Sequence, residues 1–443
     1  MSLIHRLRGD WPFAAARSPV FYGWVIAFLS TLGFLMSIPG QTMGMAVFAD
    51  AFIDVTGLSR TQLSTAYLIG TLGSAFLLTH AGRWYDRYGA RVMMFGASVL
   101  LGATLVFLAA IDLLAVSLAA VTSLDLVTVA FPLMVLGYFG VRFAGQGVLT
   151  SASRNVLLVW FVRRRGFVSG LRGVFVSLGF SIAPFLIALL MDATTWRGAL
   201  LWMAVAVGVG FALIVLVWIR DHPGVSGLHP DGGAVRDSAE PTAAAEDDCT
   251  LAHARRDPVF WLYALSLSMH ALFGTAVTFH IVAIFDAAGR SRAEAFAYFI
   301  PQAVVSLTVN LSASTLSDHM RLKPWLVIML VAFLVGAFGL TRLTEDFGYY
   351  LLIAGFGAGG GLWGVLSNLA FIRHYGALHL GEISGFNTSL TVTASAIGPV
   401  AFALALDVFA SFNAAAYACM SGLALLLLAA VVVPQPRDKA PVR

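Results

Sequence analysis

The stretch Gly82–Arg91, which reads Gly-Arg-Trp-Tyr-Asp-Arg-Tyr-Gly-Ala-Arg, decides the fold. It carries four charges in ten residues and separates two apolar runs, each long enough to cross a bilayer. Because so short a polar stretch keeps the chain near the membrane surface, the flanking helices are predicted to be antiparallel neighbours. Gly82 and Gly89 permit close approach and tight turning.

The same pattern occurs a second time in the chain. A Gly-x-Ser-Arg sequence precedes an apolar run, and an acidic and a basic residue follow it at fixed distances. The pairs Gly57–Arg60 and Gly289–Arg292, Asp86 and Asp318, and Arg91 and Lys323 each differ by 232 in residue number. This agreement without gaps predicts two related halves.

The composition identifies an integral membrane protein. Hydrophobic residues make up 59% of the 443 residues and charged residues 11%, whereas a soluble chain carries about 25% charged residues. The predicted fold is all-α, with twelve transmembrane helices in two pseudo-symmetric six-helix bundles. The predicted spans lie at about 21–48, 62–80, 92–114, 127–150, 167–191, 196–219, 258–285, 293–315, 324–343, 348–371, 382–406 and 410–433.

The positive charges set the predicted orientation. With the N-terminus inside, 20 of the 27 Lys and Arg residues fall on the cytoplasmic side, Arg154 among them, and five fall outside. This bias predicts two cytoplasmic termini in a bacterial-type inner membrane. Residues 221–257, rich in Pro, Gly, Asp, Glu and Ala, predict a flexible cytoplasmic linker between bundles at 1–220 and 258–443.

Two prolines repeat in a shared context. Ala183-Pro184 through Asp192 aligns without gaps with Gly398-Pro399 through Asp407. A proline removes one backbone hydrogen bond and bends a membrane helix. Although prolines are common in membrane helices, the paired position predicts two matched bends, and Pro184 and Pro399 are predicted gating residues.

With twelve helices in a 6+6 arrangement and a central linker, the chain resembles the major facilitator superfamily. Gly82, Asp86, Arg87, Gly89 and Arg91 match its signature loop between helices 2 and 3. The run Arg142–Gly147, Arg-Phe-Ala-Gly-Gln-Gly, resembles its helix 4 motif. The resemblance implies a secondary carrier working by alternating access. It also implies a gating role for the loop, in which Asp86 latches the cytoplasmic side through contacts with helix ends.

Two further stretches resemble the monocarboxylate and oxalate/formate type of carrier. They are Phe21–Val25 leading to Pro39–Thr42, and Trp160–Gly166. Carriers of this type bind carboxylates with a membrane-buried Lys or Arg in helix 1, 8 or 11, and this sequence has none there. The substrate of those carriers is therefore not transferred to this chain from the resemblance.

Arg142 is the leading candidate for binding an anion. It lies near the middle of predicted helix 4, where a guanidinium costs at least ~2.5–3.5 kcal/mol unless it faces water or a partner. Arg142 either attracts an anionic substrate or tunes a polar network beside it. The structural alternative is that Arg142 bonds carbonyl groups of helix 1, or Gln41, and holds the N-terminal half together.

Other polar residues of the predicted helices are candidates to line a cavity between the halves. Amides and hydroxyls are costly in hydrocarbon unless they are paired or wet, and each can instead join two helices. Besides Arg142, the predicted substrate-binding residues are Gln41, Thr42, Tyr67, Gln146, Gln302, Asn310, Asn387 and Thr391.

His270 and His280, in predicted helix 7, are candidates for proton coupling because histidine titrates near neutral pH. A lone membrane histidine also serves as a packing residue, and that alternative stays open.

These observations predict a secondary transporter for a small organic anion such as a monocarboxylate. The alternative is a proton-coupled exporter of neutral or amphiphilic compounds. An enzyme is excluded because the sequence holds no paired metal ligands, phosphate-binding loop or catalytic constellation. No cofactor, metal or nucleic acid is expected, and the expected state is a monomer in the lipid bilayer.

Overall fold

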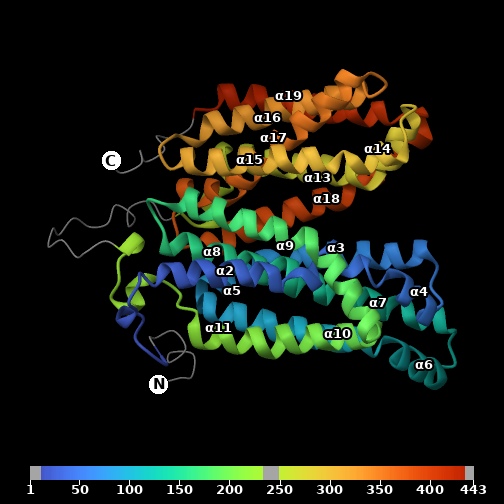
Figure 1. Cartoon of the computed structure of the whole chain (residues 1–443), viewed down its shortest axis with the longest axis horizontal. Coiled ribbons are helices and arrows are strands. Elements are labelled where there is room, and N and C mark those ends of the chain that lie inside the picture. Colours follow the sequence, from blue (N-terminus) through green and yellow to red (C-terminus); the bar gives the residue numbers. More distant parts are fainter. Residues whose placement is uncertain (1–10, 233–248, 435–443) are drawn as a thin grey trace. The chain divides into compact units, whose positions relative to one another are not determined.

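The computed structural model describes residues 11–232 and 249–434, apart from the side chains of residues 60, 61, 292, 293 and 296. The regular elements in these residues are helices (Figure 1). Within the described residues, ten helical stretches are long and apolar enough to cross a membrane. One of them, Gln62–Ala109, holds two predicted spans, and the first predicted span is divided into shorter helices. All twelve predicted spans thus fall on helices, and the predicted all-α membrane fold is confirmed.

The chain forms two compact units. Unit 1 comprises Met1–Val162, Phe175–Ala239 and Ser384–Thr388, and unit 2 comprises Arg163–Val174, Glu240–Ile383 and Ser389–Arg443. Each unit therefore contains most of one predicted half and a short helical stretch of the other. The division into 1–220, 221–257 and 258–443 stays a prediction.

Unit 1 is built around α5 (Arg60–Ala109). Ser59 and Gln62 form a reciprocal capping box at its start. Its backbone is non-helical at Gly89 (φ 84°, ψ 172°), so two helical spans meet there, within the stretch that predicts the turn. The other helices are α2 (Gly23–Met36), α3 (Thr42–Ala46), α4 (Ala49–Thr56), α6 (Ile111–Thr122), α7 (Leu126–Val141), α8 (Thr150–Trp160), α10 (Trp196–Val205) and α11 (Ala212–Trp218).

The first predicted span, 21–48, is not a continuous helix, which corrects the prediction. The 3-10 turn Ile38–Gly40 separates α2 from α3. Pro39 has no amide hydrogen to continue the helix, and Gln41 is extended (φ −86°, ψ 156°). The break leaves the carbonyl group of Gly40 outside the backbone hydrogen bonds. Gly40 also lies against Gly145, where a side chain on either residue would meet the other's backbone.

The chain is packed on unit 1 where α11 ends. Arg220 is 1% exposed and donates to the carbonyl groups of Val217 (2.8 Å), Ile219 (3.0 Å) and Phe13 (3.0 Å). The indole of Trp160 in turn donates to the carbonyl group of Arg220 (3.1 Å). We call these residues the Arg220 cluster.

The predicted flexible linker, 221–257, is structured at both of its described ends. After the Arg220 cluster follow the 3-10 turns Pro223–Ser226 and Pro230–Gly232, and Asp231 accepts the amide of Val162 (2.9 Å). A short helix, α12 (Leu251–Ala254), precedes the next span. The described parts of this segment thus hold short helical turns, its role as a linker stays a prediction, and residues 233–248 lie outside the described residues.

Unit 2 packs its helices through glycines. Gly336 and Gly355 lie against each other where α16 crosses α17, because small residues let membrane helices approach closely. The helices that follow α12 are α13 (Pro258–Ala287), α14 (Arg292–Ala297), α15 (Phe299–Ser317), α16 (Leu322–Thr341), α17 (Asp346–Tyr375), α18 (Leu380–Phe409) and α19 (Phe412–Val432).

The sequence repeat has a structural counterpart in each unit. In unit 1 the Nε of Arg91 donates to the carbonyl group of Ile219 (2.6 Å), the residue after the last turn of α11. In unit 2 the Nζ of Lys323 donates to the carbonyl group of Val433 (3.1 Å), the residue after α19. Equivalent basic residues therefore bind the C-terminal end of the last helix in each half, where a positive charge is favourable.

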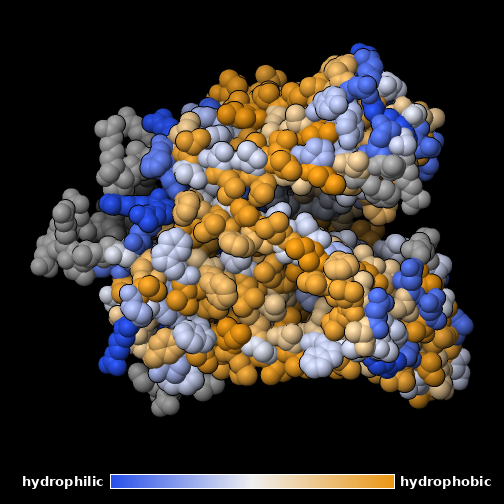
Figure 2. All heavy atoms as spheres, viewed as in Figure 1, coloured by the Kyte–Doolittle hydropathy of each residue, from blue (hydrophilic) through white to orange (hydrophobic). Residues whose placement is uncertain are grey.

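The surface is apolar where helices run and polar at their ends. Figure 2 shows hydrophobic residues along the helices of both units and hydrophilic residues gathered near the helix ends. Large apolar side chains are more than half exposed, including Phe28, Phe76, Phe185, Phe279, Ile300 and Val408. Such a surface is stable in lipid and not in water.

Candidate functional site

Arg142 lies in the membrane interior of unit 1. It begins the π-helical segment Arg142–Leu149 between α7 and α8, near the middle of the spanning stretch Leu126–Trp160. It is 5% exposed. Its Nη1 donates to the carbonyl group of Gly40 (3.2 Å) and to the hydroxyl of Thr42 (3.4 Å). Its guanidinium lies 5.3 Å from the ring centre of Tyr67.

The site around Arg142 is only partly satisfied. The hydroxyls of Thr42 and Tyr67 are hydrogen-bonded (2.7 Å), and Thr42 is exposed, so the cluster reaches the surface of unit 1. The buried Nε of Arg142 has no hydrogen-bond partner in the described residues. The structure thus brings three predicted binding residues together around one buried donor that is unused in the described residues.

Gln41 belongs to a neighbouring cluster. Its Nε2 donates to the hydroxyls of Ser37 (3.1 Å) and Thr150 (3.4 Å), and Thr150 also donates to the carbonyl group of Gly145 (3.0 Å). The carbonyl group of Gly145 also accepts the backbone amide of Thr150, where the π-helical segment ends, and π-helical turns are frequent at functional sites. Gln146 is half-buried, and its side chain forms no hydrogen bond with the described residues.

The predicted residues of unit 2 form a separate polar row. The amide of Asn310 on α15 donates to the carbonyl group of Gly361 (2.9 Å). Arg172 on α9 (Arg165–Ala193), which sequence reasoning did not place among the binding residues, donates to Asn368 on α17 (2.7 Å). Gln302 is half-buried on α15.

Asn387 and Thr391 both lie on α18, but in different units. Asn387 is 4% exposed and belongs to the stretch Ser384–Thr388 of unit 1, whereas Thr391 belongs to unit 2. Their shared role stays a prediction.

The two histidines of α13 have different surroundings. His270 stacks on Phe333 (ring centres 4.6 Å apart) and lies 5.2 Å from Trp363, and its buried Nδ1 has no partner in the described part of unit 2. The Nε2 of His280 is hydrogen-bonded to the carbonyl group of Pro399 on α18 (2.9 Å). His280 therefore joins α13 to the predicted bend of α18.

Both predicted bends lie at the same place in their helices. Pro184 follows the first residue of α9 by nineteen residues, and Pro399 follows the first residue of α18 by nineteen residues. Their gating role stays a prediction.

The predicted loop residues Gly82, Asp86, Arg87, Gly89 and Arg91 all fall within the bounds of α5. At the equivalent position in unit 2, the carboxylate of Asp318 accepts the amides of Gly166 (2.7 Å) and Phe167 (3.0 Å) at the start of α9. Arg373 donates to the same carboxylate (3.4 Å). Burial raises the pKa of the Asp318 carboxyl, and the two amides and the Arg373 charge act in the opposite direction. A carboxylate at a helix N-terminus is the contact that the resemblance implies for Asp86.

Sequence reasoning missed Arg154. It was counted among the cytoplasmic charges, but it lies inside α8, and the apolar run Val156–Trp160 continues beyond it. That continuation was the available signal, because a charge at a true helix end is not followed by another buried turn.

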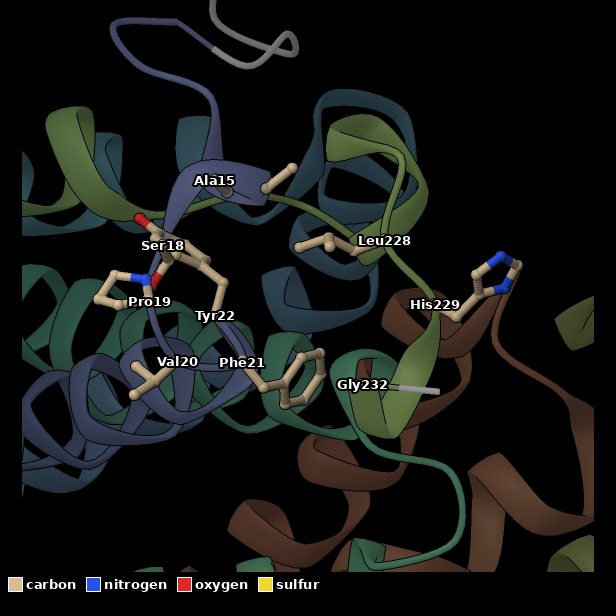
Figure 3. A pocket seen from close by; sticks show the side chains of 10 residues that line it. Ala15, Ser18, Pro19, Val20, Phe21, Tyr22, Leu228, His229 and Gly232 are labelled. Atoms are coloured by element: carbon tan, nitrogen blue, oxygen red, sulfur yellow. The ribbon is translucent and has the colours of Figure 1, made fainter. Parts of the chain in front are cut away.

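One pocket of about 240 Å³ lies in unit 1 beside the Arg220 cluster. Figure 3 shows Phe21 and Tyr22 on one side of it and Leu228, His229 and Gly232 on the other. It contains none of the predicted substrate residues.

Comparison with known proteins places the chain among transporters. The sequence model of the Major Facilitator Superfamily matches residues 23–399. No curated protein matches in sequence. A bacterial homologue of the iron transporter ferroportin is 18% identical, with 91% of this chain and 98% of that chain covered and a TM-score of 0.71.

Two further structures are similar. For the proton:xylose symporter XylE the identity is 15%, the coverage 95% of this chain and 97% of that chain, and the TM-score 0.65. For the human organic anion transporter MFSD10 the identity is 16%, the coverage 94% and 99%, and the TM-score 0.58. At these identities the likeness shows the fold.

Proposed function

Because the chain belongs to the Major Facilitator Superfamily, we propose that it moves a small organic anion, such as a monocarboxylate, by alternating access. Members of this superfamily are secondary transporters, so the chain is an integral membrane transporter of a small molecule and not an enzyme. The observation that carries the anion proposal is the buried Nε of Arg142, which has no partner in the described residues.

The chemistry of the Arg142 site fits a carboxylate. A guanidinium presents donors in a fixed fork that matches two carboxylate oxygens. The Nη1 of Arg142 is held by Gly40 and Thr42, which orients the fork and leaves Nε for the substrate. The hydroxyls of Thr42 and Tyr67 are hydrogen-bonded to each other, so one of the two keeps its hydrogen to donate to the same anion. Gln146 supplies a further amide on the same segment.

The alternative is a proton-coupled exporter of neutral or amphiphilic compounds. It is favoured by the two bonds between Arg142 and helix 1, which are those of a structural arginine, and by the unpartnered Nδ1 of His270. We propose a monomer with both termini cytoplasmic in a bacterial-type inner membrane for either substrate.

The test is thermal stabilisation of the purified protein by monocarboxylates, sugars and hydrophobic amines. Wild type, Arg142→Gln and Arg342→Gln are compared, because Arg342 is an exposed arginine of unit 2. A carboxylate at about 100 times its Kd should stabilise wild type and Arg342→Gln by about 2.7 kcal/mol. Arg142→Gln should be stabilised less than the other two proteins by the same carboxylate. Equal stabilisation of all three by the carboxylate would remove Arg142 from the anion site, and stabilisation of all three by amines alone would favour the exporter.

Gating is proposed to use the loop and the bends. Asp86→Asn and Asp318→Asn should each weaken a carboxylate contact with a helix N-terminus and shift the population of states. Accessibility of single cysteines on the two membrane faces measures this shift. Unchanged accessibility in both variants would remove the loops from the gate.

A further inference from the structure

Arg154 occupies an unusual position on α8. It lies twelve residues after Arg142 in the same spanning stretch, Leu126–Trp160, which places it about 18 Å further along the helix. Arg154 is half-buried with its Nη2 fully buried, and the side chain forms no hydrogen bond, ion pair or ring contact with any residue that the structure describes. Arg142, by contrast, has two bonds to helix 1.

The residues on either side of Arg154 are unsatisfied as well. Ser153 is 0% and Asn155 is 1% exposed, and the Oγ of the first and the Oδ1 of the second lack partners within the described ranges. The Nδ2 of Asn155 donates to the hydroxyl of Ser384 (3.0 Å). In residues 11–232 and 249–434, this is the only run of three consecutive residues that each hold a buried polar atom without a partner.

The amide of Asn155 can be turned so that its oxygen and nitrogen exchange places. Oxygen and nitrogen of an amide are assigned from the hydrogen-bond network and are not distinguished by shape. If the amide is turned, the hydroxyl of Ser384 donates to Oδ1, and Nδ2 becomes the atom without a partner. The second orientation presents a free amide donor beside the guanidinium of Arg154.

Buried polar groups without partners cost free energy, and a guanidinium costs more than a neutral group. An oxyanion removes this cost, because it accepts hydrogen bonds from a guanidinium and an amide and compensates the charge. A hydrophobic or cationic ligand would leave the guanidinium unsatisfied.

We propose that Arg154 and Asn155 form a second oxyanion site, which binds the carboxylate of the transported molecule between Arg142 and the predicted cytoplasmic face. The inference rests on the proposed function for the identity of the anion. An anionic lipid headgroup has the same chemistry, and the test separates the two sources.

The experiment is modification of arginine by phenylglyoxal in the purified, detergent-solubilised protein, with the extent at Arg154 read from peptides by mass spectrometry. Sodium lactate is compared with sodium chloride at equal ionic strength. Lactate at about ten times its Kd should slow the reaction at Arg154 about tenfold, because about one site in ten stays free. The reaction at the exposed Arg342 should not change. The protection should persist in Arg142→Gln, which shows that the two sites bind independently.

A parallel assay measures lactate counterflow in proteoliposomes, so that failure of the site and failure of the carrier are distinguished. Protection of Arg154 without counterflow supports the oxyanion site and refutes the anion carrier. Counterflow that saturates while Arg154 stays unprotected overturns the site and leaves the carrier standing. Protection by dioleoylphosphatidylglycerol but not by lactate overturns the site as a substrate site, as does an Arg154 that phenylglyoxal never reaches in chloride.

Discussion

Replacing Arg220 by Gln tests whether the end of α11 is a structural anchor. Arg220 donates hydrogen bonds to the carbonyl groups of Phe13, Val217 and Ile219 at 2.8–3.0 Å. Its guanidinium also lies 4.8 Å from the ring centre of Phe13. One side chain therefore joins the segment before α2 to the last turn of α11.

The magnitude follows from these contacts. A hydrogen bond to a charged group contributes about 1.5–3 kcal/mol, and a cation at a helix C-terminus contributes about 0.3–1 kcal/mol. The full loss of three such bonds is an upper limit, because Gln keeps one amide donor and water can reach the half-buried Phe13. We expect a net loss of about 3 kcal/mol, at the lower end of the cost of breaking a buried ion pair.

The assay is thermal unfolding of the purified protein followed by tryptophan fluorescence. A loss of about 3 kcal/mol lowers Tm by about 6–12 °C for a unit of this size. Arg220→Lys should fall between wild type and Arg220→Gln, because Lys keeps the charge but not the fork. Arg342→Gln is the matched control, since Arg342 is exposed and its only described ion pair is 3.9 Å long. A Tm of Arg220→Gln within about 2 °C of that control would refute the reasoning.

Three further predictions follow from local geometry. Gly89→Ala should lower the free energy of unfolding by about 1–3 kcal/mol in a melting experiment, because the φ of 84° and ψ of 172° suit glycine alone. Gly289→Ala should lower it by about 1–2 kcal/mol, because Gly289 also has a positive φ (74°) but has open space around it. Arg197→Gln removes the 2.7 Å ion pair with Asp112. Because this pair is partly exposed, its loss should lower the free energy of unfolding by at most about 1 kcal/mol in a melting experiment, and by less in 1 M salt. The pKa of the Glu294 carboxyl is lowered by hydrogen bonds from the amide and the hydroxyl of Ser291 and by Arg290. The cap therefore contributes its full stability above the ordinary Glu pKa of about 4.3, and this contribution is lost as the pH falls through the lowered pKa. Hydrogen-exchange protection of α14 should fall over the same pH range, and Glu294→Gln should show no such pH dependence.

The sequence determined the local features that depend on nearest neighbours. The repeated Gly-x-Ser-Arg sequences predict equivalent helix starts, and Ser59 and Ser291 each cap a helix through the residue three positions later. Capping is a contact between residues three apart, so the chain specifies it without help from the fold. The glycines Gly57 and Gly289 before them have φ values of 71° and 74°.

The membrane spans were determined in the same way, because each must bury about 20 apolar residues whatever its neighbours are. The break in the first span was not predicted. Pro39 was visible in the sequence, but whether a helix bends or ends at a proline depends on partners for the freed carbonyl groups. Here the partner of the Gly40 carbonyl group is the guanidinium of Arg142, 102 positions away in the chain, which donates a hydrogen bond to it.

The tertiary structure alone decided which charges are buried. Arg154 and Arg220 are charged residues near the ends of apolar runs, and the count of Lys and Arg on the two sides of the membrane placed both on the cytoplasmic side. Packing brings the carbonyl group of Phe13, 207 positions away, to Arg220 beside the neighbouring carbonyl groups of Val217 and Ile219, and leaves Arg154 with none among the described residues. The burial of a side chain and its hydrogen-bond partners depend on residues that are remote in sequence, so a local sequence pattern does not predict them. They distinguish an arginine with a structural role from an arginine that is proposed to bind an anion.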